Sequence, residues 1–438
     1  MTQQLQTFQM YIDGQWTDGS QGQTMQSINP ATGNAWASFS CTSPDDVDRA
    51  VKAARRALNE GPWPAMTATQ RGKLLYRLAD LIQENDQKLG EYETMDSGKL
   101  LAETQIQTGY VSDYYRYYAG LADKIQGATL PIDKPDMHVY TTREPIGVVA
   151  AVVPWNAQMF LTATKVGPAL AAGCTIILKA SEISPCAMLE FARLIDEAGF
   201  PPGVVSIITG DAPNCSIPLT SHPDVDRIAF TGSPETARHV VRNSAENFAV
   251  TTLELGGKSP IVVFDDADLD SAANGMIAGN FGASGQSCVA GTRAFVHRSI
   301  KDKLVTMIKE KASTIVIGDP LDADSHIGPL CTTVQVERIE ETLEKAKAQG
   351  ASIVLGGERP QGLSDELAGG SYFSPTIVDC PNDQIETLKV EMFGPVMSIV
   401  AFDTEEEAIA MANDSVFGLG SGVFTQNLAR AHRVSKKL

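Results

Sequence analysis

Cys288 lies in a stretch of small residues, FGASGQSCVAGTR (281–293), which offers little for a buried side chain to pack against. A free cysteine usually behaves as a small buried hydrophobe among bulky apolar neighbours. Small neighbours instead leave room for a ligand to reach the sulfur, and a cysteine is appreciably nucleophilic near neutral pH. Cys288 is therefore a candidate nucleophile, with a role as core filler as the alternative.

Polar side chains follow two predicted strands. Asn156 ends the motif PWN (154–156), where its amide could donate to a developing oxyanion or could cap the helix that starts near Gln158. Lys179 and Glu182 lie in LKASE at the end of the next strand. They are either solvated or hold ribose hydroxyls, which an ammonium and a carboxylate can do.

Two glycine-containing turns are further candidates for ligand binding. FTGSPETAR (230–238) predicts strand, turn and helix, so free N–H groups could receive a pyrophosphate, although Ser233 is explained equally well as a plain N-cap. ELGGKSP (254–260) is not a phosphate loop, because Thr252 occupies the position of that loop's first glycine. What remains is Glu254 beside two glycines that allow close backbone approach, or a structural turn.

A last motif, EMFGPV (391–396), joins a carboxylate, an aromatic ring and a rigid Gly-Pro turn ahead of a strand. By residue type alone, Phe393 is more often a core residue than a cofactor contact.

The elements that must position these residues form two series. A hairpin is predicted at 8–17 around an Asp-Gly turn, and long helical patterns follow at 43–60, 67–98 and 100–127. From residue 146, short β-rich runs alternate with helices, and a second alternating series begins near 261. This pattern predicts two α/β domains with mostly parallel sheets. The series meet at 252–260, where we expect a ligand cleft.

Composition excludes several classes of protein. The chain has 438 residues and a formal net charge of −18, which disfavours nucleic acid and anionic membranes as partners. Its N-terminus lacks the pattern of a signal peptide, so we expect a cytoplasmic protein. The seven cysteines are an odd number and widely spaced, and the six histidines are scattered, so neither a disulfide framework nor a metal site is expected.

Taken in order, PWN, LKASE, FTGS, ELGGKSP, GQSC and EMFGPV resemble the motifs of the aldehyde dehydrogenase superfamily, and the resemblance runs from the N-terminal hairpin to the last residue. It implies an NAD(P)-binding Rossmann-like domain at 1–122 and 145–256 and a catalytic domain at 257–438. A small β element at 123–144 would bridge them and serve oligomer contact. Homodimers or homotetramers are expected if the family's C-terminal segment is present.

The resemblance also assigns roles to residues. Cys288 is the nucleophile, Glu254 the general base, and Asn156 with the Cys288 N–H the oxyanion hole. The cofactor contacts implied are Pro154, Trp155, Lys179, Ser181, Glu182, Phe230, Thr231, Gly232, Ser233, Leu255, Gly256, Glu391 and Phe393. Gln335 and Arg338 flank the nicotinamide end. By position, the substrate pocket includes Tyr110, Ala157, Phe160, Leu161, Thr164, Ser287 and Val289.

The expected reaction is oxidation of an aldehyde to the carboxylic acid with NAD(P)+, through a cysteine thiohemiacetal and a thioester. NAD is expected rather than NADP, because Glu182 would repel a 2′-phosphate. The alternatives are a CoA-acylating relative, which needs no hydrolytic base and is disfavoured by Glu254, and a nucleotide-binding protein without activity. The neutral pocket predicts a medium-sized, uncharged or weakly polar aldehyde as the substrate.

The sequence departs from the family pattern at three places. The usual paired glutamate of the last motif reads Val390-Glu391, and the helix glycine after FTGS is Ala237. Family members are also expected to continue for several dozen residues beyond Leu438. If this is the whole polypeptide, exposed sheet edges and a partly open substrate pocket are expected.

Overall fold

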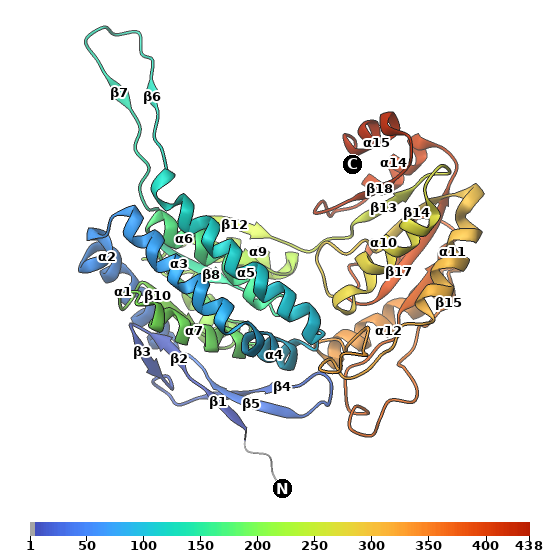
Figure 1. Cartoon of the computed structure of the whole chain (residues 1–438), viewed down its shortest axis with the longest axis horizontal. Helices are drawn as coiled ribbons and strands as arrows, with labels where there is room; N and C mark the ends of the chain where they lie inside the picture. Colours follow the sequence, from blue (N-terminus) through green and yellow to red (C-terminus); the bar gives the residue numbers. More distant parts are fainter. Residues whose placement is uncertain (1–4) are drawn as a thin grey trace. The chain divides into compact units, whose positions relative to one another are not determined.

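The computed structural model describes residues 5–438, and residue contacts divide the chain into two units (Figure 1). Unit one contains residues 5–28, 35–96 and 104–254, and unit two contains Asn29–Asn34, Ser97–Glu103 and Leu255–Leu438. Each unit has its own parallel sheet and its own buried cores. The predicted fold class, two α/β units with mostly parallel sheets, is confirmed.

The main sheet of unit one has seven strands in the order β12-β11-β8-β9-β10-β2-β3. Neighbours from β12 to β10 are parallel, whereas β2 runs antiparallel to both β10 and β3. The strands are β2 (Met10–Ile12), β3 (Gln15–Thr17), β8 (Val148–Val152), β9 (Thr175–Lys179), β10 (Val205–Ile208), β11 (Arg227–Thr231) and β12 (Val250–Glu254). Strands β8, β9 and β10 are almost completely buried, as apolar runs covered on both faces should be.

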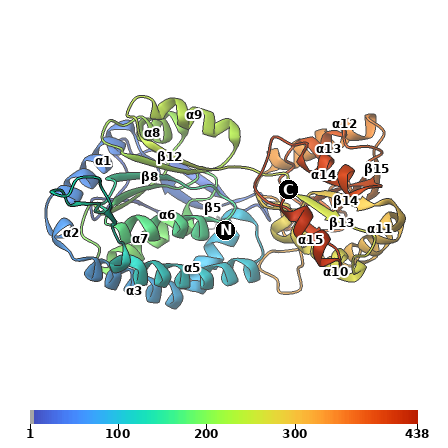
Figure 2. The same cartoon turned by 90° about the horizontal axis from the view of Figure 1, so that it is seen from above.

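Helices cover both faces of this sheet (Figure 2). One face carries α1, α8 and α9, and the other carries α6 and α7 with α3 and α5 outside them. The helices of unit one are α1 (Pro44–Asn59), α2 (Pro62–Ala65), α3 (Ala68–Glu84), α4 (Asp86–Ser97), α5 (Leu101–Leu121), α6 (Gln158–Ala172), α7 (Cys186–Ala198), α8 (Ile217–Thr220) and α9 (Pro234–Ser244). The last residue of α4 and the first three of α5 belong to unit two.

Two smaller sheets complete unit one. Strands β1 (Gln6–Phe8), β5 (Ala35–Ser40) and β4 (Thr24–Ile28) form the first, in that order. Strands β6 (Thr129–Leu130) and β7 (Val139–Tyr140) form a hairpin that projects from the rest of the unit (Figure 1).

Unit two is built on a six-stranded sheet in the order β15-β16-β17-β14-β13-β18. Every neighbouring pair is parallel except β15 and β16. The strands are β13 (Pro260–Val263), β14 (Arg293–His297), β15 (Ser352–Leu355), β16 (Thr376–Asp379), β17 (Val396–Phe402) and β18 (Gly422–Phe424). The helices are α10 (Leu269–Phe281), α11 (Arg298–Ala312), α12 (Thr333–Ala348), α13 (Glu386–Lys389), α14 (Glu405–Asn413) and α15 (Leu428–Ser435). Helices α10 and α11 lie on one face of the sheet, and α12, α13 and α14 on the other (Figure 2).

One local prediction is confirmed and two need correction. The hairpin turn at Asp13-Gly14 has both residues at positive φ, as a two-residue Asp-Gly turn requires. The helical pattern at 67–98 was expected to be continuous, but Asn85 caps α3 and separates it from α4. The last stretch, NLARAHRVSKKL, predicts a helix that runs to the last residue, but α15 ends at Ser435. Within residues 5–438, no helix is long and apolar enough to cross a membrane.

Candidate active site

The loop that leads to Cys288 has an unusual backbone. Ala283, Ser284 and Gly285 lie consecutively at φ values of +50°, +56° and +72°. A Cβ on Gly285 would overlap the carbonyl group of Gly394, so the loop packs directly against the EMFGPV turn. Glycine at 285 therefore permits the close turn that the loop makes here.

Cys288 differs from the other cysteines in its exposure. All seven are free thiols, and six of them are buried, whereas Cys288 is half-buried. Its carbonyl oxygen occupies the place that a Cβ on Gly257 would take, so only glycine fits at 257. A partly accessible thiol among small residues can be reached by a substrate, as a reactive cysteine must be.

Glu391 joins two motifs that are far apart in sequence. Its Oε1 accepts a hydrogen bond from the N–H of Gly257 at 2.9 Å, and a Cβ on Gly256 would overlap its carboxylate. Burial raises the pKa of Glu391, against the Gly257 N–H and the charges of Lys258 and Arg338, which lower it. Unit two therefore brings together Cys288, the glycine pair of ELGGKSP and the carboxylate of EMFGPV.

The backbone after Glu391 is also held in a special conformation. Phe393 lies at φ +49°, and the side-chain amide of Gln335 donates to the carbonyl of Met392. Gln335 thus contacts this turn, while the expectation that Gln335 and Arg338 flank the nicotinamide end stays a prediction.

Glu254 is the last residue of β12, in unit one, and its side chain is exposed. It is paired in register with Thr231 at the end of β11. The buried ammonium of Lys165 donates to Thr231 Oγ1 at 2.7 Å and to the Leu161 carbonyl at 3.4 Å. Burial lowers the pKa of Lys165 to about 8, while the charge of Glu254 works to raise it.

Lys165 was missed by sequence reasoning, although a signal was present. It is the only charged residue in the stretch 158–172, QMFLTATKVGPALAA, which forms α6. A lone charge on an otherwise apolar helix between two buried strands needs a partner or a function. Thr231 supplies that partner in the structure.

Asn156 lies after β8 and is half-buried. Helix α6 begins at Gln158 as expected, but its N-cap position is occupied by Ala157, which makes no side-chain cap. The buried carboxylate of Glu93 instead accepts the N–H of Met159 at 3.1 Å. Asn156 is therefore not the N-cap residue of α6, and its amide stays a candidate for binding the oxyanion.

The residues expected to contact the adenosine end lie at the carboxyl ends of the strands in unit one. Lys179 ends β9, is buried, and forms an ion pair with Glu182. Ser233 caps α9, its hydroxyl accepting the N–H of Thr236 at 3.1 Å. Gly232 lies against the buried ring of Phe230. Other predicted contacts are placed nearby in sequence: Ser181 is buried, Pro154 and Trp155 are half-buried, and Leu255 follows β12.

The predicted substrate residues are divided between the units. In unit one, Tyr110 on α5 is 66% exposed and Phe160 on α6 is 37% exposed, while Ala157, Leu161 and Thr164 are half-buried. In unit two, Ser287 and Val289 flank Cys288, half-buried and exposed respectively.

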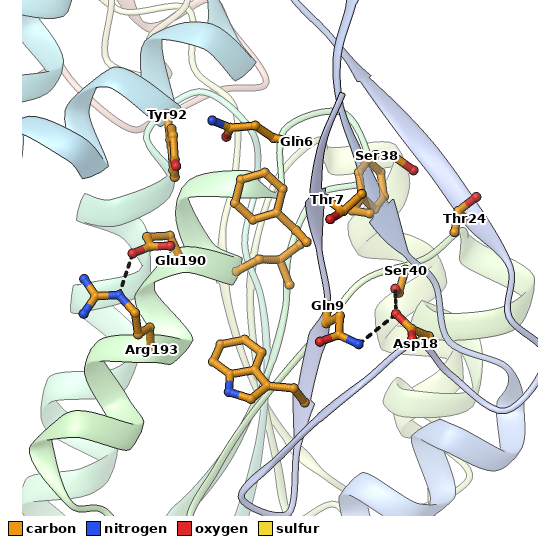
Figure 3. Close-up of a pocket in the computed structure, with 14 residues that line it drawn as sticks. Gln6, Thr7, Gln9, Asp18, Thr24, Ser38, Ser40, Tyr92, Glu190 and Arg193 are labelled. Atoms are coloured by element: carbon orange, nitrogen blue, oxygen red, sulfur yellow. Dashed lines mark hydrogen bonds and ion pairs between the residues drawn. The ribbon is translucent and has the colours of Figure 1, made fainter. Parts of the chain in front are cut away.

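Unit one also contains a cavity of about 700 Å³ (Figure 3). It is lined by residues of β1, β5 and α7, among others, and none of the predicted site residues belongs to its lining. Its polar groups bind one another: Gln9 and Ser40 donate to Asp18, and Arg193 donates to Glu190. In the described part of the chain, no group of three or more His, Cys, Asp or Glu side chains could hold a metal ion.

The fold and these motifs define a two-unit α/β enzyme with an accessible cysteine. The sequence model of the aldehyde dehydrogenase family matches residues 16–438, and the chain belongs to this family. It is an oxidoreductase that acts on an aldehyde.

Similar proteins include dehydrogenases from several bacteria. (Z)-2-((N-methylformamido)methylene)-5-hydroxybutyrolactone dehydrogenase of Acinetobacter baylyi is 52% identical over 99% of this chain and 88% of that protein. An NAD+ complex of aldehyde dehydrogenase from Bacillus cereus has a TM-score of 0.95 at 40% identity, covering 99% of this chain and 87% of the other. Betaine aldehyde dehydrogenase from Staphylococcus aureus with NAD+ has a TM-score of 0.96 at 38% identity, covering 98% and 85%. These findings favour neither the CoA-acylating alternative nor an inactive nucleotide-binding protein.

Proposed function

We propose that Cys288 is the nucleophile of the aldehyde oxidation, that Glu254 is the general base, and that Asn156 and the Cys288 N–H stabilise the oxyanion. The observation that carries the proposal is the exposure of Cys288: in the part of the chain that the structure describes, it is the one cysteine that is not buried. The glycines at 257 and 285 support it, because they allow the backbone around the thiol to pack as closely as it does.

The chemistry follows from these groups. The Cys288 sulfur attacks the aldehyde carbon as the thiolate, and the carbonyl oxygen becomes an oxyanion that accepts hydrogen bonds from the Asn156 amide and the Cys288 N–H. Bound NAD+ would supply the acceptor for the hydride of that carbon. Loss of the hydride leaves the carbon bonded to Cys288 as a thioester. Glu254 then takes a proton from a water molecule, the water oxygen attacks the thioester carbon, and the carbon–sulfur bond breaks to release the acid.

We propose NAD+ as the cofactor. The Bacillus cereus and Staphylococcus aureus relatives were solved with NAD+. In this chain the start of α9 at Ser233 suits the pyrophosphate, and Lys179 with Glu182 suits the adenosine ribose. The carboxylate of Glu391 lies where a Cβ on Gly256 would be, and its oxygens suit the hydroxyls of the nicotinamide ribose.

The proposed substrate is a medium-sized, uncharged or weakly polar aldehyde. None of the seven residues proposed for the pocket carries a charge, and Ala157 and Thr164 are small. The Acinetobacter baylyi relative is named for a hydroxybutyrolactone, whose closed ring is neutral. We therefore expect neutral aldehydes to react with higher kcat/KM than short anionic semialdehydes, and the opposite ranking would refute the proposed substrate class.

The test is NADH absorbance after mixing the protein with NAD+ and a panel of neutral and anionic aldehydes. Cys288→Ala should abolish turnover, whereas Glu254→Gln should retain one rapid burst of NADH and lose steady-state turnover by roughly 100-fold or more. Cys331→Ala, at a buried cysteine, is the matched control. Turnover by Cys288→Ala would overturn the assignment of the nucleophile.

We also propose a cytoplasmic location, supported by the free thiols and by a chemistry that needs Cys288 reduced. Fractionation of cells that express the tagged chain tests this location, and recovery outside the cytoplasmic fraction would contradict it.

A further inference from the structure

The conformation of the loop before Cys288 is not one that its side chains favour. Ala283 and Ser284 both carry a Cβ and both lie in the left-handed region, followed by Gly285. Two consecutive residues of this kind cost conformational free energy, which the surrounding structure must offset. Groups in neighbouring segments must therefore hold this loop.

Three hydrogen bonds hold the loop at successive points. The N–H of Ala283 donates to Glu103 Oε1 at 2.7 Å, the hydroxyl of Ser284 donates to the Gly328 carbonyl at 2.8 Å, and Gln286 Oε1 accepts the N–H of Cys331 at 2.8 Å. The first is the only one of the three made by an acidic side chain. A hydrogen bond to a charged acceptor is roughly twice as strong as a neutral one.

Glu103 is itself firmly anchored in unit two. It lies in the first turn of α5, where the N–H of Leu101 donates to the Pro320 carbonyl at 2.9 Å. Just before this turn, Gly98 lies so close to Pro329 that a Cβ there would come within 2.7 Å of the proline ring. The segment that carries Glu103 therefore packs against the segment that carries Gly328 and Cys331.

The second carboxylate oxygen of Glu103 indicates a role other than stability. Oε2 is buried and has no hydrogen-bond partner within residues 5–438. Burying a carboxylate oxygen without a partner is unfavourable, so a glutamate retained for stability alone would be a poor choice at this position.

We propose that Glu103 is a positioning residue for the nucleophile, fixing the Ala283–Gly285 backbone so that the thiol and the N–H of Cys288 face the substrate together. The proposal rests on the proposed function, because it assumes that Cys288 reacts. Glu103 does not touch substrate or cofactor in this scheme. Loss of the Glu103 carboxylate should slow the reaction at the Cys288 thiol and leave the affinity for NAD+ unchanged.

The experiment compares Glu103→Ala and Glu103→Gln with Glu337→Ala, an exposed glutamate on α12, as the matched control. Glu103→Ala should lower kcat and the rate at which iodoacetamide alkylates Cys288, each by roughly 10- to 100-fold, because a small misplacement of a reacting group has effects of that size. The KM for NAD+ should change less than about twofold. Glu103→Gln keeps an acceptor oxygen and should recover part of both rates.

A double variant separates positioning from stability. Ala283→Gly removes the Cβ that makes the left-handed conformation costly, so Glu103→Ala with Ala283→Gly should recover part of kcat without a matching gain in melting temperature. The proposal is overturned if Glu103→Ala keeps the wild-type kcat and alkylation rate. It is also overturned if both rates fall only in step with the melting temperature and neither Glu103→Gln nor the added Ala283→Gly restores them. Mass spectrometry locates the alkylated cysteine. If the label lies on another cysteine and Cys288→Ala is still active, the proposed function has failed rather than the role of Glu103.

Discussion

At the scale of single residues, Lys258 is a buried cation beside the candidate site. It follows the glycine pair that contacts Glu391, and its ammonium has no hydrogen-bond partner among the described residues. Burial and, to a smaller extent, the charge of Arg293 lower its pKa to about 7, while the charge of Glu391 works to raise it. Below pH 7 the lysine is therefore charged in the folded and the unfolded chain, and the folded chain bears the cost of burying that charge.

This pKa gives a prediction for stability. Between pH 7 and about 10.5 the folded chain binds fewer protons at Lys258 than the unfolded chain, so the free energy of unfolding rises with pH across that window. Lys258→Met should raise the melting temperature most below pH 7, and the difference should shrink towards pH 10. Thermal unfolding at pH 6, 8 and 10 measures it. A difference that is the same at every pH would contradict the assigned titration.

The ion pair of Lys179 with Glu182 predicts how cofactor choice can be changed. The Glu182 carboxylate would repel a 2′-phosphate, and removing its charge frees the Lys179 ammonium to attract one. Glu182→Gln should raise kcat/KM for NADP+ relative to NAD+ by roughly tenfold, which corresponds to about 1.4 kcal/mol. Steady-state kinetics with both cofactors measures the ratio, with Glu197→Gln on the exposed side of α7 as the control. An unchanged ratio would remove Glu182 from the ribose site.

At the scale of elements, the start of α1 depends on one buried carboxylate. Ser43 and Asp46 form a capping box, and Asp46 also accepts hydrogen bonds from Ser20. Burial works to raise the pKa of Asp46, but the N–H groups of Ser43 and Ser20 outweigh it and hold the pKa below its usual value. The ionised form is thus favoured in the folded chain.

Asp46→Asn should therefore lower the free energy of unfolding by about 1–3 kcal/mol at pH 7. A lowered pKa contributes stability above the unfolded value, near pH 4, which is lost as the pH falls through the folded value. The difference between wild type and variant should accordingly shrink as the pH falls below about 4 and through the folded pKa. Urea unfolding at pH 7 and at a series of acidic pH values measures it, with the exposed Asp45→Asn as the control. A deficit that persists undiminished at low pH would mean that the charge is not what stabilises the helix.

The elements also show what the sequence can predict. The start of α1 and the Asp13-Gly14 hairpin follow from signals within a few residues, and both were predicted correctly. The break at Asn85 was not, because the helical pattern continues through it while its side chain bonds back to the Leu81 carbonyl. Likewise, the motifs around Cys288 and Glu391 were identified separately. Their contact through Gly257 joins residues about a hundred positions apart, which no local pattern encodes.

At the scale of the whole molecule, the exposed apolar side chains of the β6–β7 hairpin indicate contact with a partner subunit. Its two strands have two residues each, and an isolated hairpin of this size is not expected to be stable in water. Apolar side chains along it are 44–65% exposed: Leu130, Ile132, Met137 and Tyr140. We expect a second copy of the chain to cover them, in a homodimer or homotetramer.

Light scattering coupled to size-exclusion chromatography tests this expectation. The intact chain should elute with at least twice the monomer mass of 46.9 kDa, and replacing residues 129–140 by a short Gly-Ser linker should lower that mass. The substitution Val416→Ser, at a residue that is 94% exposed in unit two, should leave the mass unchanged and serves as the control. A monomer with the hairpin intact, or an unaltered oligomer without it, would show that the hairpin does not hold the subunits together.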